Sequence, residues 1–165
     1  MPDVTVIGCG NLLRGDDGLA WQAARELARH LGAEAQFVEE GRCLSADGRV
    51  EIVACQQLTL DLLETVNQAG RVIFVDASVK GEPGTLSVES VVPDTPQNLI
   101  SHQFDPPTLL AAVQALYGTC PPAVLCSVTA ASFDYVEQLS PLVARALPDL
   151  VRRVEEMMEK RGGDA

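Results

Sequence analysis

The sequence is poor in basic residues, in aromatic residues and in long apolar stretches. It has 12 Lys and Arg against 23 Asp and Glu, a formal net charge of −11. Because nucleic acids and anionic membranes are bound through Lys and Arg, this balance argues against both as partners. No stretch approaches the roughly 18 apolar residues of a membrane span. Aromatic residues make up only 4% of the chain, so aliphatic side chains must fill the core.

The five cysteines lack the spacing of a disulfide framework or of a zinc site, since their number is odd and no two form a C-x-x-C pair. Scattered single cysteines are typical of reduced, cytosolic proteins. The N-terminus also lacks the basic and apolar regions of a signal peptide. We therefore expect a cytoplasmic protein whose cysteines serve as small core residues. Cys9 is the exception, because it lies beside the candidate site described below.

Motifs of common nucleotide-binding and hydrolytic α/β enzymes are missing. Gly8 and Gly10 follow a strand-like run, but Leu13 occupies the third glycine position of the dinucleotide fingerprint. Neither a phosphate-binding P-loop nor a G-x-S-x-G nucleophile elbow occurs. A nucleotide binder or small-molecule hydrolase on a generic α/β sheet is therefore a weak alternative.

Apolar runs of strand length alternate with stretches of helical periodicity, which predicts an α/β fold in three layers, with a largely parallel sheet covered on both faces. We expect one domain over residues 1–165. The predicted strands are 4–7, 36–38, 50–55, 72–75, 85–92 and 123–128. The predicted helices are 18–31, 59–69, 107–117 and one that opens at Ser140 and Pro141. We expect 36–38 to pair with 50–55 as a hairpin, Pro148 to kink or interrupt the last helix, and 161–165 to fray.

Acidic residues follow two of these strands, and a histidine lies in a later loop. Asp16 and Asp17 come after the first strand, Asp76 directly follows 72–75, and His102 precedes the 107–117 helix. If the first and fourth strands are neighbours, these loops converge at one edge of the sheet. Two carboxylates and an imidazole can hold a divalent metal or perform acid–base chemistry without one. Helix caps and a surface histidine are the simpler alternatives, although Asp76 ends a very apolar strand, where an unpaired charge is costly.

Four segments, in order, resemble the [NiFe]-hydrogenase maturation endopeptidases. They are Ile7–Gly18, Val75–Ala77 with Pro83–Leu86, Ser101–His102 before Leu109–Leu110, and Leu139–Pro141. The resemblance covers nearly the whole chain. It implies a twisted sheet of about five strands between helices. It also implies that Asp17, Asp76 and His102 are the metal ligands and catalytic residues, whereas Asp16 has a structural role.

The resemblance further implies an endopeptidase that removes the C-terminal extension of a [NiFe]-hydrogenase large-subunit precursor. Cleavage would follow nickel insertion, with the nickel supplied by the precursor rather than held permanently, and the protein would be a monomer. The alternative is a module that binds the same precursor without cutting it. The segment Cys55–Thr59 departs from the usual G-T-x-G loop and resembles the variant that serves bidirectional, NAD-linked cytoplasmic hydrogenases. A second departure is Ala20, where many members have glycine.

Overall fold

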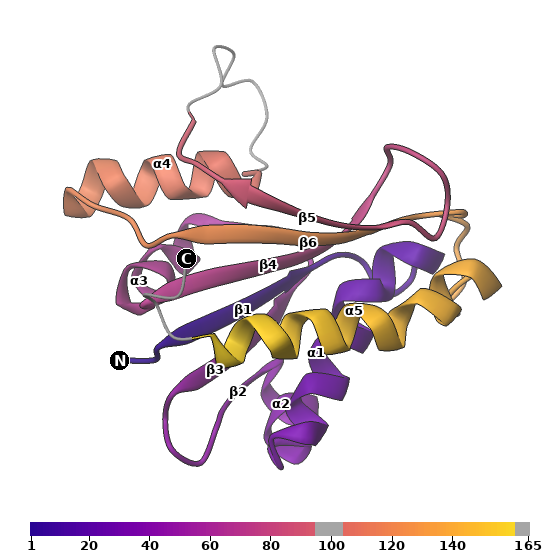
Figure 1. The fold of residues 1–165 in the computed structure, drawn as a ribbon, viewed down its shortest axis with the longest axis horizontal. Coiled ribbons are helices and arrows are strands. Elements are labelled where there is room, and N and C mark those ends of the chain that lie inside the picture. The colour runs from indigo at the N-terminus through magenta and orange to yellow at the C-terminus, as the bar shows by residue number, and fades with distance from the viewer. Residues whose placement is uncertain (95–103, 161–165) are drawn as a thin grey trace.

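Six strands form one twisted sheet in the computed structural model, which describes residues 1–94 and 104–160 (Figure 1). The strands are β1 (Val4–Cys9), β2 (Arg42–Leu44), β3 (Val50–Cys55), β4 (Arg71–Ser78), β5 (Leu86–Val91) and β6 (Ala123–Thr129). Their order across the sheet is β2-β3-β1-β4-β6-β5. The four central strands are parallel, and the two edge strands, β2 and β5, are antiparallel to their neighbours. The predicted α/β class and largely parallel sheet are confirmed.

Helices cover both faces of this sheet. On one face lie α1 (Leu19–His30), α2 (Glu34–Glu40) and α5 (Pro141–Glu159); on the other lie α3 (Leu63–Gln68) and α4 (Pro106–Tyr117). Short 3₁₀ turns, Gly15–Gly18 and Leu60–Leu62, precede α1 and α3. None of the helices in the described part of the chain is long and apolar enough to cross a membrane.

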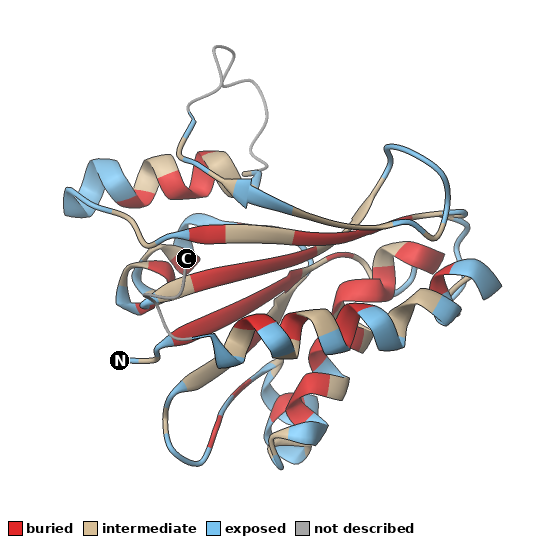
Figure 2. Cartoon of the chain, viewed as in Figure 1, coloured by how far each residue is buried: buried red, intermediate tan, exposed pale blue. Residues whose placement is uncertain are grey.

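The central strands are buried on both faces, as Figure 2 shows by their red interiors. In β4, Val72 and Phe74 pack into the cluster beneath α3 and α4. Ile73 and Val75 of the same strand pack into the cluster beneath α1 and α5. The near-continuous apolar run of this strand is thus explained by two covered faces rather than one.

The prediction of a strand at 36–38 is wrong, because these residues lie within α2. Phe37 is buried against Trp21 of α1, with ring centroids 6.2 Å apart. A three-residue apolar run fits a buried helix turn as well as a strand, so its length alone does not distinguish the two. The hairpin partner of β3 is instead β2, joined to it by a turn at 45–48.

The predicted helix opening at Ser140 and Pro141 is confirmed, and the helix predicted at 107–117 begins one residue earlier, at Pro106. Asp105 caps α4 by accepting a hydrogen bond from the Thr108 N–H at 2.9 Å, and Ser140 caps α5. Pro148 does not interrupt α5, which runs unbroken to Glu159. Ala144, whose carbonyl loses its helical partner at Pro148, is exposed, so water can satisfy that carbonyl. The expected fraying of 161–165 concerns residues outside those described.

Candidate functional site at the carboxyl ends of the strands

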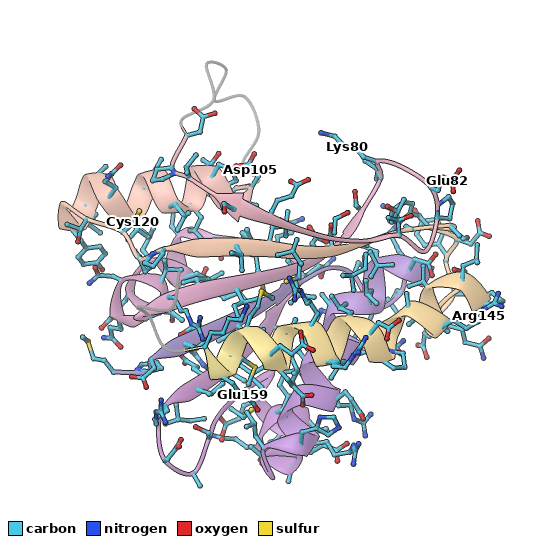
Figure 3. All side chains as sticks on the ribbon, viewed as in Figure 1. Lys80, Glu82, Asp105, Cys120, Arg145 and Glu159 are labelled. Atoms are coloured by element: carbon cyan, nitrogen blue, oxygen red, sulfur yellow. The ribbon has the colours of Figure 1, made fainter. Side chains whose placement is uncertain are left out.

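A cavity of about 380 Å³ opens where β1 and β4 end. These strands are parallel neighbours, so the predicted convergence of their loops is confirmed. Both Asp17 and Asp76 line the cavity. The other lining residues are Cys9, Gly10, Asn11, Arg14, Gln56, Gln57, Leu58, Phe104, Asp105 and Pro106. Asp105, at the first turn of α4, is labelled in Figure 3. The cavity therefore combines the two predicted carboxylates, Asp17 and Asp76, with the carboxylate of Asp105, which caps α4, and with backbone and side-chain donors from three loops.

Asp76 lies within β4 rather than directly after it, because the strand continues to Ser78 alongside β6. Its side chain is half-buried, and its Oδ1 accepts a hydrogen bond from the Ala77 N–H at 2.8 Å. Burial raises the pKa of Asp76 to about 7, and the charge of Asp17 adds to the rise, although the Ala77 hydrogen bond opposes it. A carboxyl group with this pKa exists in both protonation states near neutral pH. Asp76 can therefore accept or donate a proton.

Asp17 is held in place by the turn that follows β1. The Asn11 N–H donates a hydrogen bond to Asp17 Oδ2 at 2.9 Å. Gly10 packs so closely that a Cβ at this position would lie 1.9 Å from the Asp17 carbonyl oxygen. The Trp21 indole N–H fixes the same turn by donating to the Gly10 carbonyl at 2.8 Å. A glycine at position 10 is thus required for the turn to reach Asp17.

Asp16 points away from the cavity and is completely buried. Its carboxylate accepts hydrogen bonds from the N–H groups of Ala131, Ser132 and Ser140 and from the Ser140 hydroxyl, at 2.7–2.9 Å. Burial raises the pKa of Asp16, but these hydrogen bonds outweigh it and hold the pKa below its usual value. Asp16 therefore joins the 131–140 loop and the start of α5 to the first loop, which agrees with the structural role expected for it.

His102, the third residue of the predicted set, lies outside the described residues. Within residues 1–94 and 104–160, no group of three or more His, Cys, Asp and Glu side chains is arranged to hold a metal ion. The described part of the site therefore offers two carboxylates, whose oxygens suit a divalent cation but do not complete its coordination.

Two features of the site were not predicted from the sequence. Cys55 ends β3 beside Cys9, which ends β1, so the Cys9 thiol that lines the cavity has a second thiol directly beside it. Arg14 stacks over the rings of Phe133 and Tyr135, with its guanidinium 5.8 and 5.6 Å from their centroids. The predicted strands already ended near both cysteines, but their register, which sets them side by side, is a property of the sheet.

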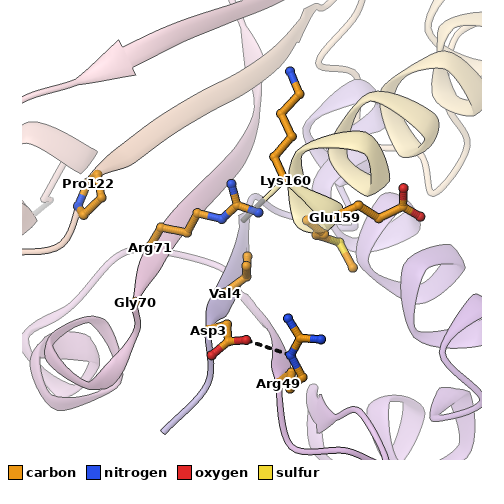
Figure 4. Close-up of a pocket in the computed structure, with 9 residues that line it drawn as sticks. Asp3, Val4, Arg49, Gly70, Arg71, Pro122, Glu159 and Lys160 are labelled. Carbon is orange, nitrogen blue, oxygen red and sulfur yellow. Dashed lines mark hydrogen bonds and ion pairs between the residues drawn. The ribbon is translucent and has the colours of Figure 1, made fainter. Parts of the chain in front are cut away.

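A larger cavity, of about 560 Å³, lies at the opposite end of the sheet (Figure 4). Arg49, Arg71 and Lys160 line it together with Asp3 and Glu159. Arg49 pairs with Asp3 at 2.7 Å, whereas the buried Nη2 of Arg71 makes no hydrogen bond with any residue that the structure describes. Ligands of open α/β sheets bind at the carboxyl ends of the strands, and both candidate aspartates are found there. We therefore assign the functional site to the smaller cavity.

No protein-family model and no curated protein sequence matches this chain. Its fold is similar to solved structures of hydrogenase maturation proteases. The maturating endopeptidase HybD from E. coli has a TM-score of 0.73 and 24% identity over 98% of this chain and 94% of that one. Two proteases from Thermococcus kodakarensis, HycI and HybD, have TM-scores of 0.69 and 0.66 and identities of 19% and 20%. HycI covers 95% of this chain and 92% of its own, and HybD 96% and 100%. At such identities the likeness establishes the fold, which is the one that the sequence resemblance implied.

Proposed function

We propose that this chain is an endopeptidase that removes the C-terminal extension of a [NiFe]-hydrogenase large-subunit precursor. The observation that carries the proposal is the pair Asp17 and Asp76, which lines one cavity at the carboxyl ends of β1 and β4. The fold, shared with solved maturation proteases over nearly the whole chain, supports it. So do the four sequence segments, since the first two of them supply these aspartates.

In this proposal the nickel belongs to the substrate. Asp17, Asp76 and the predicted third ligand His102 form an incomplete ligand set, and nickel already inserted in the precursor completes the contact. The two carboxylates favour this docking, because the charge of Asp17 disfavours ionisation of Asp76 and a dication relieves that repulsion. Docking through the metal would bring the scissile peptide into register with Asp76.

The chemical step proposed for Asp76 is acid–base catalysis of amide hydrolysis. The ionised carboxylate takes a proton from a water molecule as its oxygen attacks the scissile carbonyl. The protonated carboxyl then gives that proton to the amide nitrogen as the C–N bond breaks. A pKa near 7 suits both half-steps at neutral pH, because the carboxyl group is then present in both protonation states.

The remaining parts of the proposal concern partners and setting. We propose a monomeric, cytoplasmic protein whose macromolecular partner is the precursor. The net charge of −11 disfavours nucleic acids and anionic membranes as further partners. The segment Cys55–Thr59, which lies beside the cavity, favours a precursor from a bidirectional, NAD-linked hydrogenase.

The deciding experiment is the intact mass of a cognate large-subunit precursor after incubation with this protein. Nickel-loaded and nickel-free precursor are compared, with wild-type protein, Asp76→Asn and a matched surface variant, Asp149→Asn. We expect a C-terminal loss only with nickel, and only with the wild type and Asp149→Asn. Cleavage of the nickel-free precursor would contradict nickel recognition. A stable complex without any change in mass would favour the non-catalytic module.

A further inference from the structure

Cys9 and Cys55 are the last residues of two neighbouring parallel strands. They are direct partners in the register of β1 with β3. Neighbouring strands lie about 4.8 Å apart, which is within the Cα separation that a disulfide bridges. Both side chains pack against the same core cluster, beneath α3 and α4, so they lie on the same face of the sheet. The two sulfur atoms therefore lie on the same face of the sheet, on adjacent strands.

Each thiol also contacts the backbone of the opposite strand or its extension. Cys9 Sγ donates to the Gln56 carbonyl at 3.5 Å, and Cys55 Sγ donates to the Gly8 carbonyl at 3.7 Å. The interaction between the thiols lowers the pKa of Cys55 and raises that of Cys9, which burial raises further. Cys55 is thus the thiol that ionises first, and the thiolate is the reactive form. Both residues are half-buried, and Cys9 lines the cavity, through which an oxidant can approach the pair.

We infer that Cys9 and Cys55 form a reversible disulfide, a redox-modification site at the edge of the cavity that holds Asp17 and Asp76. With glutathione disulfide as the oxidant, the Cys55 thiolate attacks one of its sulfurs and releases one glutathione thiolate. The Cys9 thiolate then attacks the Cys55 sulfur and releases the second. Two protein thiols become one disulfide, and their two protons end on the two glutathione thiols.

The disulfide reaches Asp17 through the two residues that follow Cys9. Gly10 donates its N–H to the Cys55 carbonyl at 3.0 Å and packs against the Asp17 backbone. Asn11 holds the Asp17 carboxylate through its N–H. Drawing Cys9 toward Cys55 shifts this turn, and with it the position of Asp17. That consequence rests on the proposed function: oxidation slows precursor cleavage, because misplacing a catalytic group by about 1 Å can cost a hundredfold in rate.

The remaining cysteines provide controls. Cys43 and Cys126 are buried in the cluster on the opposite face of the sheet. Cys120 precedes β6 at the amino end of the sheet and is labelled near the C-terminus of α4 in Figure 3. No pairing of these three with Cys9 or Cys55 is compatible with the register of the strands. Cys120→Ser is therefore the matched control variant.

The test equilibrates the full chain in buffers with increasing ratios of glutathione disulfide to glutathione. Free thiols are then alkylated, and the protein is mapped by mass spectrometry. We expect a single Cys9–Cys55 cross-link, formed equally in Cys120→Ser, absent from Cys9→Ser and Cys55→Ser, and removed by dithiothreitol. A wild-type protein that keeps both thiols free, or that links other cysteines, overturns the inference. This readout needs no precursor, so its failure is distinct from a failure of the proposed function.

A second readout addresses the consequence for activity. Cleavage rates of oxidised and reduced protein are compared for the wild type and for Cys55→Ser. We expect oxidation to slow the wild type roughly tenfold to a hundredfold and reduction to restore it. The same treatment should leave the rate of Cys55→Ser unchanged relative to its own reduced form. A mapped disulfide with an unchanged wild-type rate would overturn the link to Asp17 while leaving the modification site in place.

Discussion

At the carboxyl ends of the parallel strands lie three aspartates and two thiols, whereas at the amino ends two arginines and a lysine line a larger cavity together with Asp3 and Glu159. Each end contains one poorly compensated charged group. At the carboxyl end it is Asp76, whose neighbour Asp17 has the same charge. At the amino end it is Arg71, whose pKa burial lowers and whose buried Nη2 has no hydrogen-bond partner among residues 1–94 and 104–160.

The two ends differ in what surrounds these groups. The loops around Asp76 are held in place by three features. They are the close packing at Gly10, the hydrogen bond from Trp21 to the Gly10 carbonyl, and the hydrogen-bonded carboxylate of Asp16. Around Arg71, the nearest ion pair, between Asp3 and Arg49, is exposed and joins two other residues. Cavity volume therefore does not identify which end of the sheet carries the functional site. The better criterion is the convergence of like-charged groups that are held in place by their surroundings.

The largest expected effect is on cleavage by Asp76→Asn. The substitution keeps the shape of the side chain but removes its ability to take and return a proton. We expect the cleavage rate to fall by about a thousandfold, within the usual range for loss of an acid–base group. Arg71→Met, at the other end of the sheet, should leave the rate unchanged. Time courses of precursor cleavage, followed by intact mass, measure the rates of both variants. Equal losses of cleavage rate in Asp76→Asn and Arg71→Met would contradict the assignment of the site to the carboxyl ends of the strands.

The next largest effect is on stability, by Asp16→Ala. This change removes the acceptor of four hydrogen bonds and leaves three N–H groups without it at the junction with α5. We expect the free energy of unfolding to fall by about 3–4 kcal/mol, as for loss of a buried hydrogen-bonded network. Asp149→Ala, whose ion pair with Arg152 is exposed, should change it by less than about 0.5 kcal/mol. Urea unfolding measures both, and similar values for the two would contradict the role assigned to Asp16.

Asp76 also makes stability depend on pH. Because its pKa is raised to about 7 in the folded protein, the folded state binds more protons than the unfolded state between about pH 4 and pH 7. Its contribution to stability therefore falls as pH rises through this window and is constant above it. Asparagine removes the effect, so Asp76→Asn should gain about 2 kcal/mol over the wild type between pH 5 and pH 8. A difference that does not vary with pH would show that the carboxyl is not buried as described.

Much of the fold follows from the sequence, because each central strand is a mostly apolar run of strand length and each predicted long helix has a clear opening. Asp105 and Ser140 cap their helices at the prolines that mark those openings. The structure of the 33–49 region could not be predicted in the same way. Phe37 lies in a short apolar run that fits a strand or a helix, and its contact with Trp21 in the folded protein favours the helix. Local pattern cannot report a contact that is made in the folded protein.

The site was predictable to a similar degree. Asp17 and Asp76 follow from strand endings and from the rule that parallel strands bring those endings together. The proximity of Cys9 to Cys55 could not be predicted, because it depends on the register between β1 and β3, which the sequence of neither strand determines alone. The separate directions of Asp16 and Asp17 likewise depend on the 3₁₀ turn that carries them. The role predicted for His102 stays a prediction.

The smallest expected effect, by Arg71→Met, tests the amino end directly. Methionine keeps an unbranched apolar stem and removes a guanidinium whose buried Nη2 makes no hydrogen bond within the described part of the chain. An unsatisfied buried polar group costs stability, so we expect the free energy of unfolding to stay the same or rise by about 1 kcal/mol. Arg49→Met, which breaks only the exposed pair with Asp3, is the control and should change it by about 0.5 kcal/mol or less. If Arg71→Met instead destabilises the protein by more than the control, the guanidinium has an anionic partner in solution. The larger cavity would then be a binding site for an anion. Both ends of the sheet would be binding sites, and they would differ in the ligand that each binds.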